Sequence, residues 1–229
     1  MPRHARVVVP QMPLHIVQRG NNRMDCFADD GDRLVYLRLL GDGLSRFGCA
    51  LHAYCLMTNH VHLLVTPPSV EAAAGLMHVV SQRYAQYFNR KNGRTGTLWE
   101  GRFRSSLIAS PSYLIACYRY IECNPVRAGL APHPVVYRWS SHRANAGVAC
   151  DPILAPHEEW AALGARAYRQ LFATELDANA LQRIRESLNG GFPLGFEEEV
   201  MPLLPGLRIA PGRPGRPRRK MRTCPGFWD

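Results

Sequence analysis

The apolar positions in the first half of the chain alternate between short runs and longer stretches with helical spacing. Short runs bounded by Gly, Asn or Pro are typical of strands, whereas apolar residues three and four positions apart are typical of a helix with one buried face. Capping residues and prolines indicate where the helices end. The pattern predicts strands at 14–17, 51–57, 60–66 and within 98–108, and helices over about 29–48, 69–90 and 110–124.

This order of elements is that of a ferredoxin-like antiparallel sheet with helices on one face, so we expect an α+β fold. The character of the chain changes after Trp139. Residues 155–190 have the amphipathic pattern of helices, and residues 211–222 have the Pro, Gly and Arg content of a solvated, disordered tail. We therefore predict a domain at residues 1–145, a helical extension at 146–200 and a basic tail at 201–229.

Two histidines one residue apart open the apolar run at 60–66. Because alternate side chains of a strand share a face, His60 and His62 point the same way and Val61 points to the other face. Two imidazoles on one face can bind one metal ion, since neutral histidine is a common ligand. The alternative is that both are ordinary hydrogen-bonded residues at the end of a strand.

A tyrosine and an asparagine in the third predicted helix could complete such a site. Tyr120 and Asn124 are four residues apart and so lie on one helix face, whereas Tyr118 and Glu122 are rotated away from it. Two imidazoles and the amide oxygen of Asn124 would leave a bound cation its full charge, which suits an anionic phosphodiester. A tyrosine phenol, with a reference pKa of about 10, needs such help to act as a nucleophile.

The net charge of +10 is unevenly distributed along the chain. Residues 1–150 carry 17 Lys and Arg against 8 Asp and Glu, residues 151–200 carry 4 against 9, and residues 201–229 carry 7 against 1. Localised positive charge favours a polyanion, most simply nucleic acid, as the partner of the first part and of the tail. A soluble protein that is merely basic is the alternative.

Other features of the composition narrow the class of protein. No apolar run is long enough to span a bilayer and no signal peptide opens the chain, so we expect a cytoplasmic protein without a membrane partner. The seven cysteines are scattered without a C-x-x-C pair, which argues against a disulfide framework and against a cysteine zinc site. His15 and His52 are expected to be structural, although His15 could lie near the site.

Two polar, basic stretches are candidates for contact with DNA. Between positions 99 and 104, aromatic rings alternate with guanidinium groups, which suits the bases and phosphates of a single strand; a core Trp–Phe pair with solvated arginines is the alternative. The turn at 19–23 is polar and basic, although an ordinary loop would look the same. The candidates are Trp99, Arg102, Phe103 and Arg104 in the first stretch, and Arg19, Asn21, Asn22 and Arg23 in the second.

Five motifs, in order along residues 3–145, together resemble the REP-associated tyrosine transposases of bacteria, a branch of the single-tyrosine HUH transposases. HVH at 60–62 is an HUH motif (His, bulky hydrophobe, His), and Tyr120 is the helical tyrosine. Each motif alone is weak, and their co-linear order gives the resemblance its specificity. The motifs are HIVQRGNNR, NHVHLLV, GTLWEGRFRSSLI, YRYIECNPVRAGL and YRWSSHRAN.

The resemblance implies an HUH endonuclease fold at residues 1–145 and metal-dependent cutting of single-stranded DNA beside hairpins or palindromic repeats. His60 and His62 would be the metal pair, with Asn124 as third ligand and magnesium or manganese as the ion. Tyr120 would be the nucleophile, forming a 5′-phosphotyrosyl link, releasing a 3′-hydroxyl and allowing later strand transfer without ATP. The compact members of the group usually have glutamine in place of Asn124 and end near the catalytic domain.

The implied function is that of a transposase in DNA transposition or recombination, associated with the nucleoid, for which a homodimer is one possible assembly. Two other functions fit the residues alone. A ferredoxin-like module could bind nucleic acid through aromatic residues without catalysis. A zinc hydrolase could use His60, His62 and a carboxylate such as Glu100 or Glu122, with water as the nucleophile, and would not need Tyr120.

Overall fold

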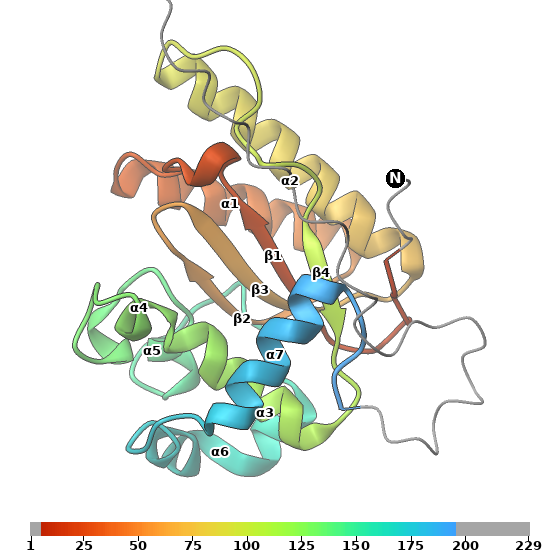
Figure 1. The fold of residues 1–229 in the computed structure, drawn as a ribbon, viewed down its shortest axis with the longest axis vertical. Coiled ribbons are helices and arrows are strands. Elements are labelled where there is room, and N and C mark those ends of the chain that lie inside the picture. The colour runs from red at the N-terminus through yellow and green to blue at the C-terminus, as the bar shows by residue number, and fades with distance from the viewer. Residues whose placement is uncertain (1–5, 196–229) are drawn as a thin grey trace, which may run out of the picture.

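Four antiparallel strands form the centre of the fold. A computed structural model describes residues 6–195 of the chain. β1 pairs with β3 and with β4, and β2 pairs with β3, each time antiparallel, which confirms the predicted ferredoxin-like sheet. The strands are β1 Leu14–Arg19, β2 Ala50–Leu56, β3 His60–Thr66 and β4 Arg104–Leu107, in the spatial order β2-β3-β1-β4 (Figure 1).

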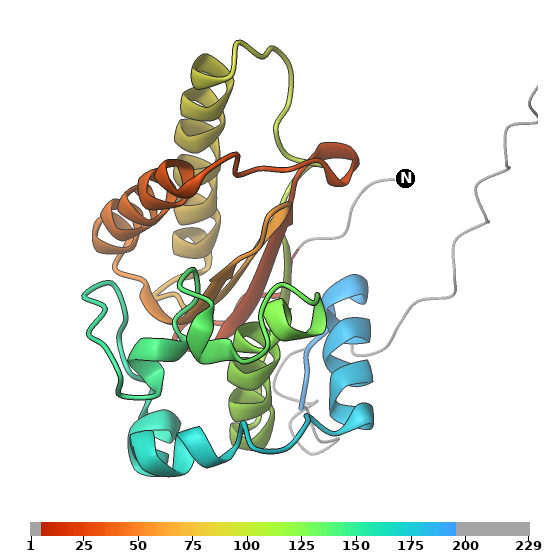
Figure 2. The ribbon, with the colours of Figure 1, turned by 90° about the vertical axis from the view of Figure 1, so that its left-hand side faces the viewer.

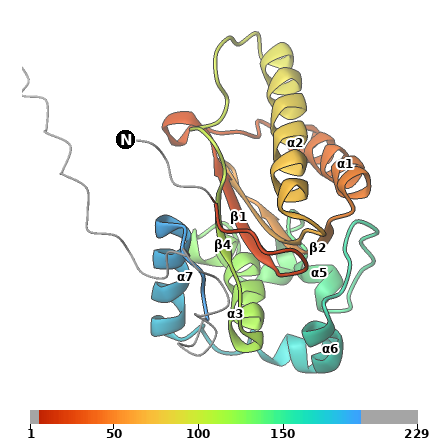
Figure 3. The same ribbon diagram turned by 90° about the vertical axis from the view of Figure 1, so that its right-hand side faces the viewer.

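Helices cover both faces of this sheet (Figure 2, Figure 3). α1 Asp30–Phe47 and α2 Val70–Lys91 lie on one face, where Leu63 belongs to the core. α3 Pro111–Glu122 lies on the other face, where Leu64 belongs to a second core. The two helices of the predicted ferredoxin-like order therefore share one face, as expected, and the third helix covers the other face. Successive residues of β3 are apolar, so both faces of the sheet need a cover.

The ends of the first two helices follow from their capping residues. The side chain of Asp29 accepts a hydrogen bond from the N–H of Asp32 at 3.0 Å, and Gly48, with φ of 63°, ends α1. The hydroxyl of Ser69 accepts from the N–H of Ala72 at the start of α2. Side-chain caps and a left-handed glycine are local signals, so the sequence predicts these boundaries closely.

The third helix ends earlier than predicted. α3 stops at Glu122, Cys123 has φ of −83° and ψ of 1°, and a separate turn, α4 Asn124–Arg127, follows. Pro125 has no N–H to donate to the carbonyl of the residue four positions earlier, which interrupts the helical hydrogen bonds. Tyr120 and Asn124 therefore lie on successive helices and are not stacked on one helix face, as the spacing had predicted.

Residues 142–190 add three helices: α5 His142–Asn145, α6 Glu158–Gln170 and α7 Ala178–Gly190. α6 and α7 contact α3, and α7 also contacts β4 (Figure 3). Two short 3-10 helices, η1 Asn21–Arg23 and η2 Pro134–Val136, precede them. No helix in the described part of the chain is long and apolar enough to cross a membrane. The domain boundary at 145 stays a prediction, and the predicted tail lies outside the described residues.

A buried carboxylate joins α3 to the segments that follow it. Glu122 is fully buried. Because a buried carboxylate needs hydrogen-bond partners, this cluster ties α3 to α5 and α6. The same contacts occupy both oxygens, so Glu122 does not suit the metal-ligand role of the hydrolase alternative. The four donors are Ser141 Oγ at 2.6 Å, His142 Nδ1 at 2.8 Å, Asn145 Nδ2 at 2.7 Å and the Tyr168 hydroxyl at 2.7 Å.

Residues from later segments pair with both edge strands of the sheet. Beside β2, the N–H of Leu56 donates to the carbonyl of Trp139 at 2.9 Å, and the N–H of Ser141 donates to the carbonyl of Tyr54 at 3.0 Å. Beside β4, the N–H of Leu194 donates to the carbonyl of Leu107 at 2.7 Å. The end of the described chain therefore lies against β4, next to α7.

Candidate active site

Strand β3 presents His60 and His62 on the sheet face that α3 covers. Their ring centroids are 4.9 Å apart, and Val61 between them is buried in the opposite core. On the neighbouring strand β1, Arg19 pairs with His60 and Val17 pairs with His62, so these side chains share that face. The two imidazoles face the same way, as the alternation predicts.

Each of the two imidazoles uses its Nδ1 atom in a hydrogen bond within the protein. Nδ1 of His60 lies 2.6 Å from Oδ1 of Asn59, and Nδ1 of His62 lies 2.9 Å from Nε2 of His15. Neither Nε2 atom has a hydrogen-bond partner among the described residues. Burial lowers the pKa of His60 to about 4 and that of His62 well below its usual value, so both rings are neutral at pH 7. Metal-binding histidines usually have this arrangement, in which one nitrogen is held and the other is free.

Helix α3 brings Tyr120 to the histidines. Its ring meets those of His62 and His15 edge-on, with centroid distances of 5.8 Å and 5.5 Å. The guanidinium group of Arg127 lies 4.5 Å from the centroid of the Tyr120 ring and donates a hydrogen bond to the Tyr120 carbonyl. Tyr118 is buried elsewhere, against Tyr168. Of the two tyrosines, Tyr120 is therefore the one that lies beside the histidines.

Asn124, the first residue of α4, lines the same cavity as the two histidines. Its Nδ2 atom is buried without a hydrogen-bond partner in the described part of the chain. No group of three or more His, Cys, Asp and Glu residues within 6–195 could hold a metal ion, so a third protein ligand would have to be of another type. The amide oxygen of Asn124 is such a ligand. The two Nε2 atoms without a partner and the amide oxygen of Asn124 are donor atoms that fit a divalent cation, whereas the buried Nδ2 group of Asn124 can only donate a hydrogen bond.

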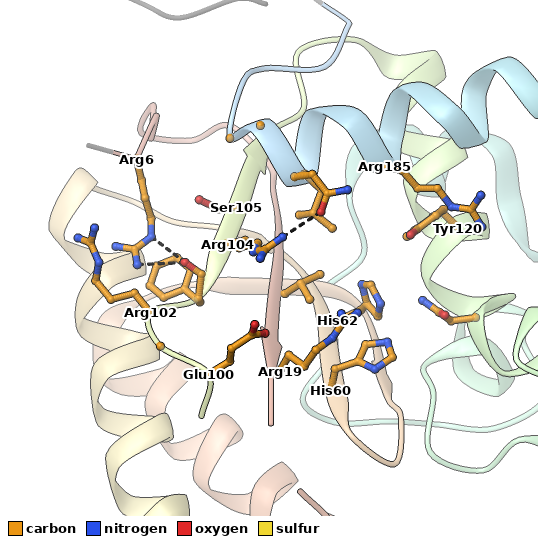
Figure 4. A pocket seen from close by; sticks show the side chains of 18 of the residues that line it. Arg6, Arg19, His60, His62, Glu100, Arg102, Arg104, Ser105, Tyr120 and Arg185 are labelled. Carbon is orange, nitrogen blue, oxygen red and sulfur yellow. Dashed lines mark hydrogen bonds between the residues drawn. The ribbon is translucent and has the colours of Figure 1, made fainter. Parts of the chain in front are cut away.

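The site opens into a cleft with a cavity volume of about 940 Å³ (Figure 4). Glu100 is the carboxylate among the residues that line it. Several arginines also line the cleft, and five of them form no ion pair with any residue that the structure describes. A cleft of this charge attracts a polyanion. These five arginines are Arg19, Arg23, Arg102, Arg104 and Arg185, and Arg6 lines the cleft with them.

The structure separates the predicted DNA-contact residues into two groups. Arg19, Arg23, Arg102, Phe103 and Arg104 line the cleft, whereas Trp99, Asn21 and Asn22 are not among its lining residues. The Trp99 ring is 6% exposed, belongs to the core and donates from Nε1 to the carbonyl of Ser81. Trp99 is therefore a core residue, as in the alternative interpretation of residues 99–104, and its ring is not available to stack on a base. The Phe103 ring has Arg6 stacked on it, 3.7 Å from its centroid.

Three residues of the site were not identified from the sequence. Nothing in the motif YRYIECNPVRAGL distinguishes Arg127 from a solvated arginine, and the sequence allows His15 to lie near the site but does not predict its hydrogen bond with His62. Arg185 comes from α7, in the acidic part of the chain, where nothing in the pattern distinguishes it from neighbouring helical arginines. Only the folded arrangement brings Arg185 to the cleft.

Comparison with known proteins adds a family and a fold. Residues 8–124, half of the chain, match the family described as "Transposase IS200 like". A REP-associated tyrosine transposase bound to a REP hairpin has a similar structure, with 14% identity, a TM-score of 0.53, and coverage of 69% of this chain and 93% of that chain. No curated protein matches the chain.

Two further solved structures match with a TM-score of 0.37 each. One is a protein from Deinococcus radiodurans assigned as a transposase, with 21% identity and coverage of 53% of this chain and 96% of that chain. The other is the tRNA(His) guanylyltransferase of Saccharomyces cerevisiae, with 10% identity and coverage of 86% of both chains. The family match confirms the resemblance seen in the motifs.

Proposed function

Because the chain belongs to the family of IS200-like transposases, we propose that it cuts single-stranded DNA with Tyr120 as the nucleophile and later transfers the cut strand. One observation carries this proposal. The Tyr120 ring lies 5.8 Å from that of His62 in a cleft that His60, Asn124 and arginine side chains also line. This arrangement supports the proposal, because the proposed nucleophile, the proposed metal ligands and a basic surface for phosphates would share one space.

The Nε2 atoms of His60 and His62 and the amide oxygen of Asn124 would hold a divalent cation, magnesium or manganese. Such an ion would polarise the phosphate and stabilise negative charge on the phenol oxygen. This would compensate for the weak nucleophilicity of a tyrosine phenol at neutral pH. The protein's own groups orient the ligands: Asn59 holds His60 and His15 holds His62. The third ligand is one methylene shorter than the glutamine usual in compact relatives.

In the proposed reaction, the Tyr120 oxygen attacks the phosphorus and loses its proton. A bond forms between that oxygen and the phosphorus, the bond from the phosphorus to the 3′ oxygen breaks, and the 3′ oxygen takes up a proton as the strand leaves. The guanidinium of Arg127, 4.5 Å from the Tyr120 ring centroid, supports negative charge on the phenol oxygen. The new phosphotyrosyl ester keeps the bond energy, so a 3′-hydroxyl can reverse the step without ATP.

The proposed substrate is single-stranded DNA beside a hairpin or palindromic repeat. Two observations support it: the arginines of the cleft, and the shared fold with a transposase whose structure is bound to a REP hairpin. Phosphate contacts from arginine position a strand without reading its sequence. DNA transposition or recombination at such repeats is the process that we propose for the protein.

Substitution of the nucleophile tests this function. Tyr120→Phe removes one hydroxyl and keeps the ring, so it should bind metal and DNA without forming a product. The wild type should form a denaturation-resistant protein–DNA adduct through a 5′ phosphate, which mass spectrometry would map to residue 120. Tyr118→Phe is the matched control on the same helix and should form the adduct. His60→Ala, His62→Ala and a chelator should each abolish it.

Other outcomes would assign the protein differently. Cleavage by the Tyr120→Phe variant without any adduct would indicate a hydrolase that uses water. DNA binding by both proteins with neither cleavage nor adduct would indicate a non-catalytic binding module. An adduct that maps to Tyr118 or Tyr113 would keep the class of enzyme and refute the assignment of Tyr120.

A further inference from the structure

One wall of the cleft comes from α7, which lies outside the residues that match the family. The Arg185 charge contributes, after burial, to lowering the pKa of Arg127, whose guanidinium stacks on Tyr120. Arg185 is therefore near the proposed nucleophile (Figure 4). The lining residues from this segment are Arg185, Leu188, Asn189, Gly190 and Gly191.

Helix α7 is held firmly against the edge strand β4. Ile184 is buried on the side of α7 that faces the protein. The hydroxyl of Ser187 forms a hydrogen bond with that of Ser106 in β4, and Nη1 of Arg104 donates to Oδ1 of Asn189 at 2.9 Å. These contacts fix the position of the α7 side chains that face the cleft.

Arg185 and Asn189 are four residues apart, so they lie on one face of α7. Arg185 is exposed and has no ion-pair partner within residues 6–195. The oxygen of Asn189 is occupied by Arg104, which leaves the Nδ2 group of Asn189 as a donor. A guanidinium group and an amide N–H group on one face suit the oxygens of a phosphate.

Other walls of the cleft carry the same charge. Arg19 and Arg23 approach from β1 and η1, and Arg102 and Arg104 from the segment that enters β4. Guanidinium groups around one cleft repel each other unless anions lie between them. A single-stranded nucleic acid supplies a series of phosphates, and so can contact several walls at once.

We propose that Arg185 and Asn189 of α7 form a phosphate-binding site for a single DNA strand, beside the phosphate that Tyr120 attacks. The inference rests on the proposed function, because it takes the ligand of the cleft to be DNA. It assigns part of the DNA-binding surface to the C-terminal extension, outside the segment that matches the family. Arg185 acts here by holding the strand and is not a catalytic residue.

The test compares two substitutions in α7 of the full-length chain. Arg185→Gln removes the proposed contact, and Arg183→Gln removes the same charge from a side chain that donates to the Tyr113 hydroxyl and does not line the cleft. Binding of a fluorescent oligothymidylate is measured over a series of salt concentrations. Arg185→Gln should weaken binding roughly tenfold and flatten the slope of log K against log salt by about 0.7. Arg183→Gln should change neither value.

Adduct formation gives a second readout. With Arg185→Gln, adduct formation should be slow at low oligonucleotide concentration and recover at saturation, because the substitution weakens binding and leaves Tyr120 in place. Equal effects of the two substitutions, or no effect of Arg185→Gln, would overturn the inference. Faster adduct formation would also overturn it and would make α7 a barrier to DNA. A wild-type chain that binds no DNA would instead refute the proposed function itself.

Discussion

His15 and His62 form a buried hydrogen bond between two imidazoles, with 2.9 Å between Nε2 of His15 and Nδ1 of His62. The position of the proton in this hydrogen bond determines whether Nε2 of His62 is available to bind a metal ion. A proton on Nδ1 of His62 leaves its Nε2 atom as a lone pair for a metal ion, whereas a proton on His15 leaves His62 protonated at Nε2. Burial lowers the pKa of His15 to about 3, so His15 stays neutral and can accept the hydrogen bond.

We expect His15→Leu to weaken manganese binding by roughly 10- to 100-fold, because His62 loses the partner that sets its orientation and tautomer. Isothermal titration calorimetry with manganese measures the affinity directly, independently of cleavage. His52→Leu is the matched control, since His52 is also a buried histidine but bonds to Ala155 and Thr66. Equal affinity in the wild type and His15→Leu would show that His15 has no part in metal binding.

Loss of the Glu122 carboxylate should destabilise the fold strongly. Glu122→Ala leaves four buried donors without their acceptor, which we expect to lower the free energy of unfolding by roughly 3–5 kcal/mol. Tyr168→Phe removes one of the donors and should cost about 1 kcal/mol. Urea denaturation of the two variants gives the comparison. Similar losses in both would mean that the cluster adds little beyond a single hydrogen bond.

Buried histidines should make the protein less stable in acid. Burial lowers the pKa of His52 to about 4, whereas an unfolded histidine has a pKa of about 6.5. Between these values the unfolded chain binds a proton that the folded chain does not. The free energy of unfolding should therefore fall as the pH decreases from about 6.5 to 4. Above pH 6.5, protonation of His52 should add no further pH dependence.

A substitution at His52 separates its share of this effect. His52→Phe should flatten the dependence of the free energy of unfolding on pH, by up to about 1.4 kcal/mol per pH unit. Part of the dependence should remain, because burial also lowers the pKa of His15 to about 3 and that of His60 to about 4. A slope unchanged by His52→Phe would contradict the assignment.

The proposed nucleophile and the histidines come from the same chain, so a single molecule should suffice for cleavage. Tyr120 contacts His62 within one chain. A mixture of Tyr120→Phe with a His60→Ala, His62→Ala double variant should therefore stay inactive, as measured by adduct formation. Restored activity in the mixture would show that the tyrosine of one copy serves the histidines of another, as in a shared-site homodimer.

Most of the sheet and the first two long helices could be predicted because their signals are local. Period-two alternation places His60 and His62 on one face, and the Asp29 and Gly48 caps set the ends of α1. The end of α3 was misplaced, although Pro125 was visible in the sequence. A helix can end several residues before a proline, and the spacing rule assumed an unbroken helix through Asn124.

Contacts between distant segments could not be predicted from one sequence. Aromatic and basic residues alternate at 99–104, yet Trp99 is turned into the core while Arg102 and Arg104 line the cleft. Chemical type does not reveal exposure when the strand is short and its partners are unknown. The approach of Arg185 to the cleft depends on the docking of α7 on β4, which leaves no periodic pattern.

The pairing of later segments with both edge strands also affects aggregation. Exposed strand edges recruit other chains by adding a strand, which leads to domain swapping or fibrils. Here Trp139 and Ser141 form hydrogen bonds with backbone groups on the β2 edge, and Leu194 forms hydrogen bonds with backbone groups on the β4 edge. A chain shortened at residue 145 would keep the histidines and Tyr120 but uncover the carbonyl of Leu107 and the N–H of Ala109. The C-terminal extension thus covers the β4 edge of the sheet against intermolecular strand pairing.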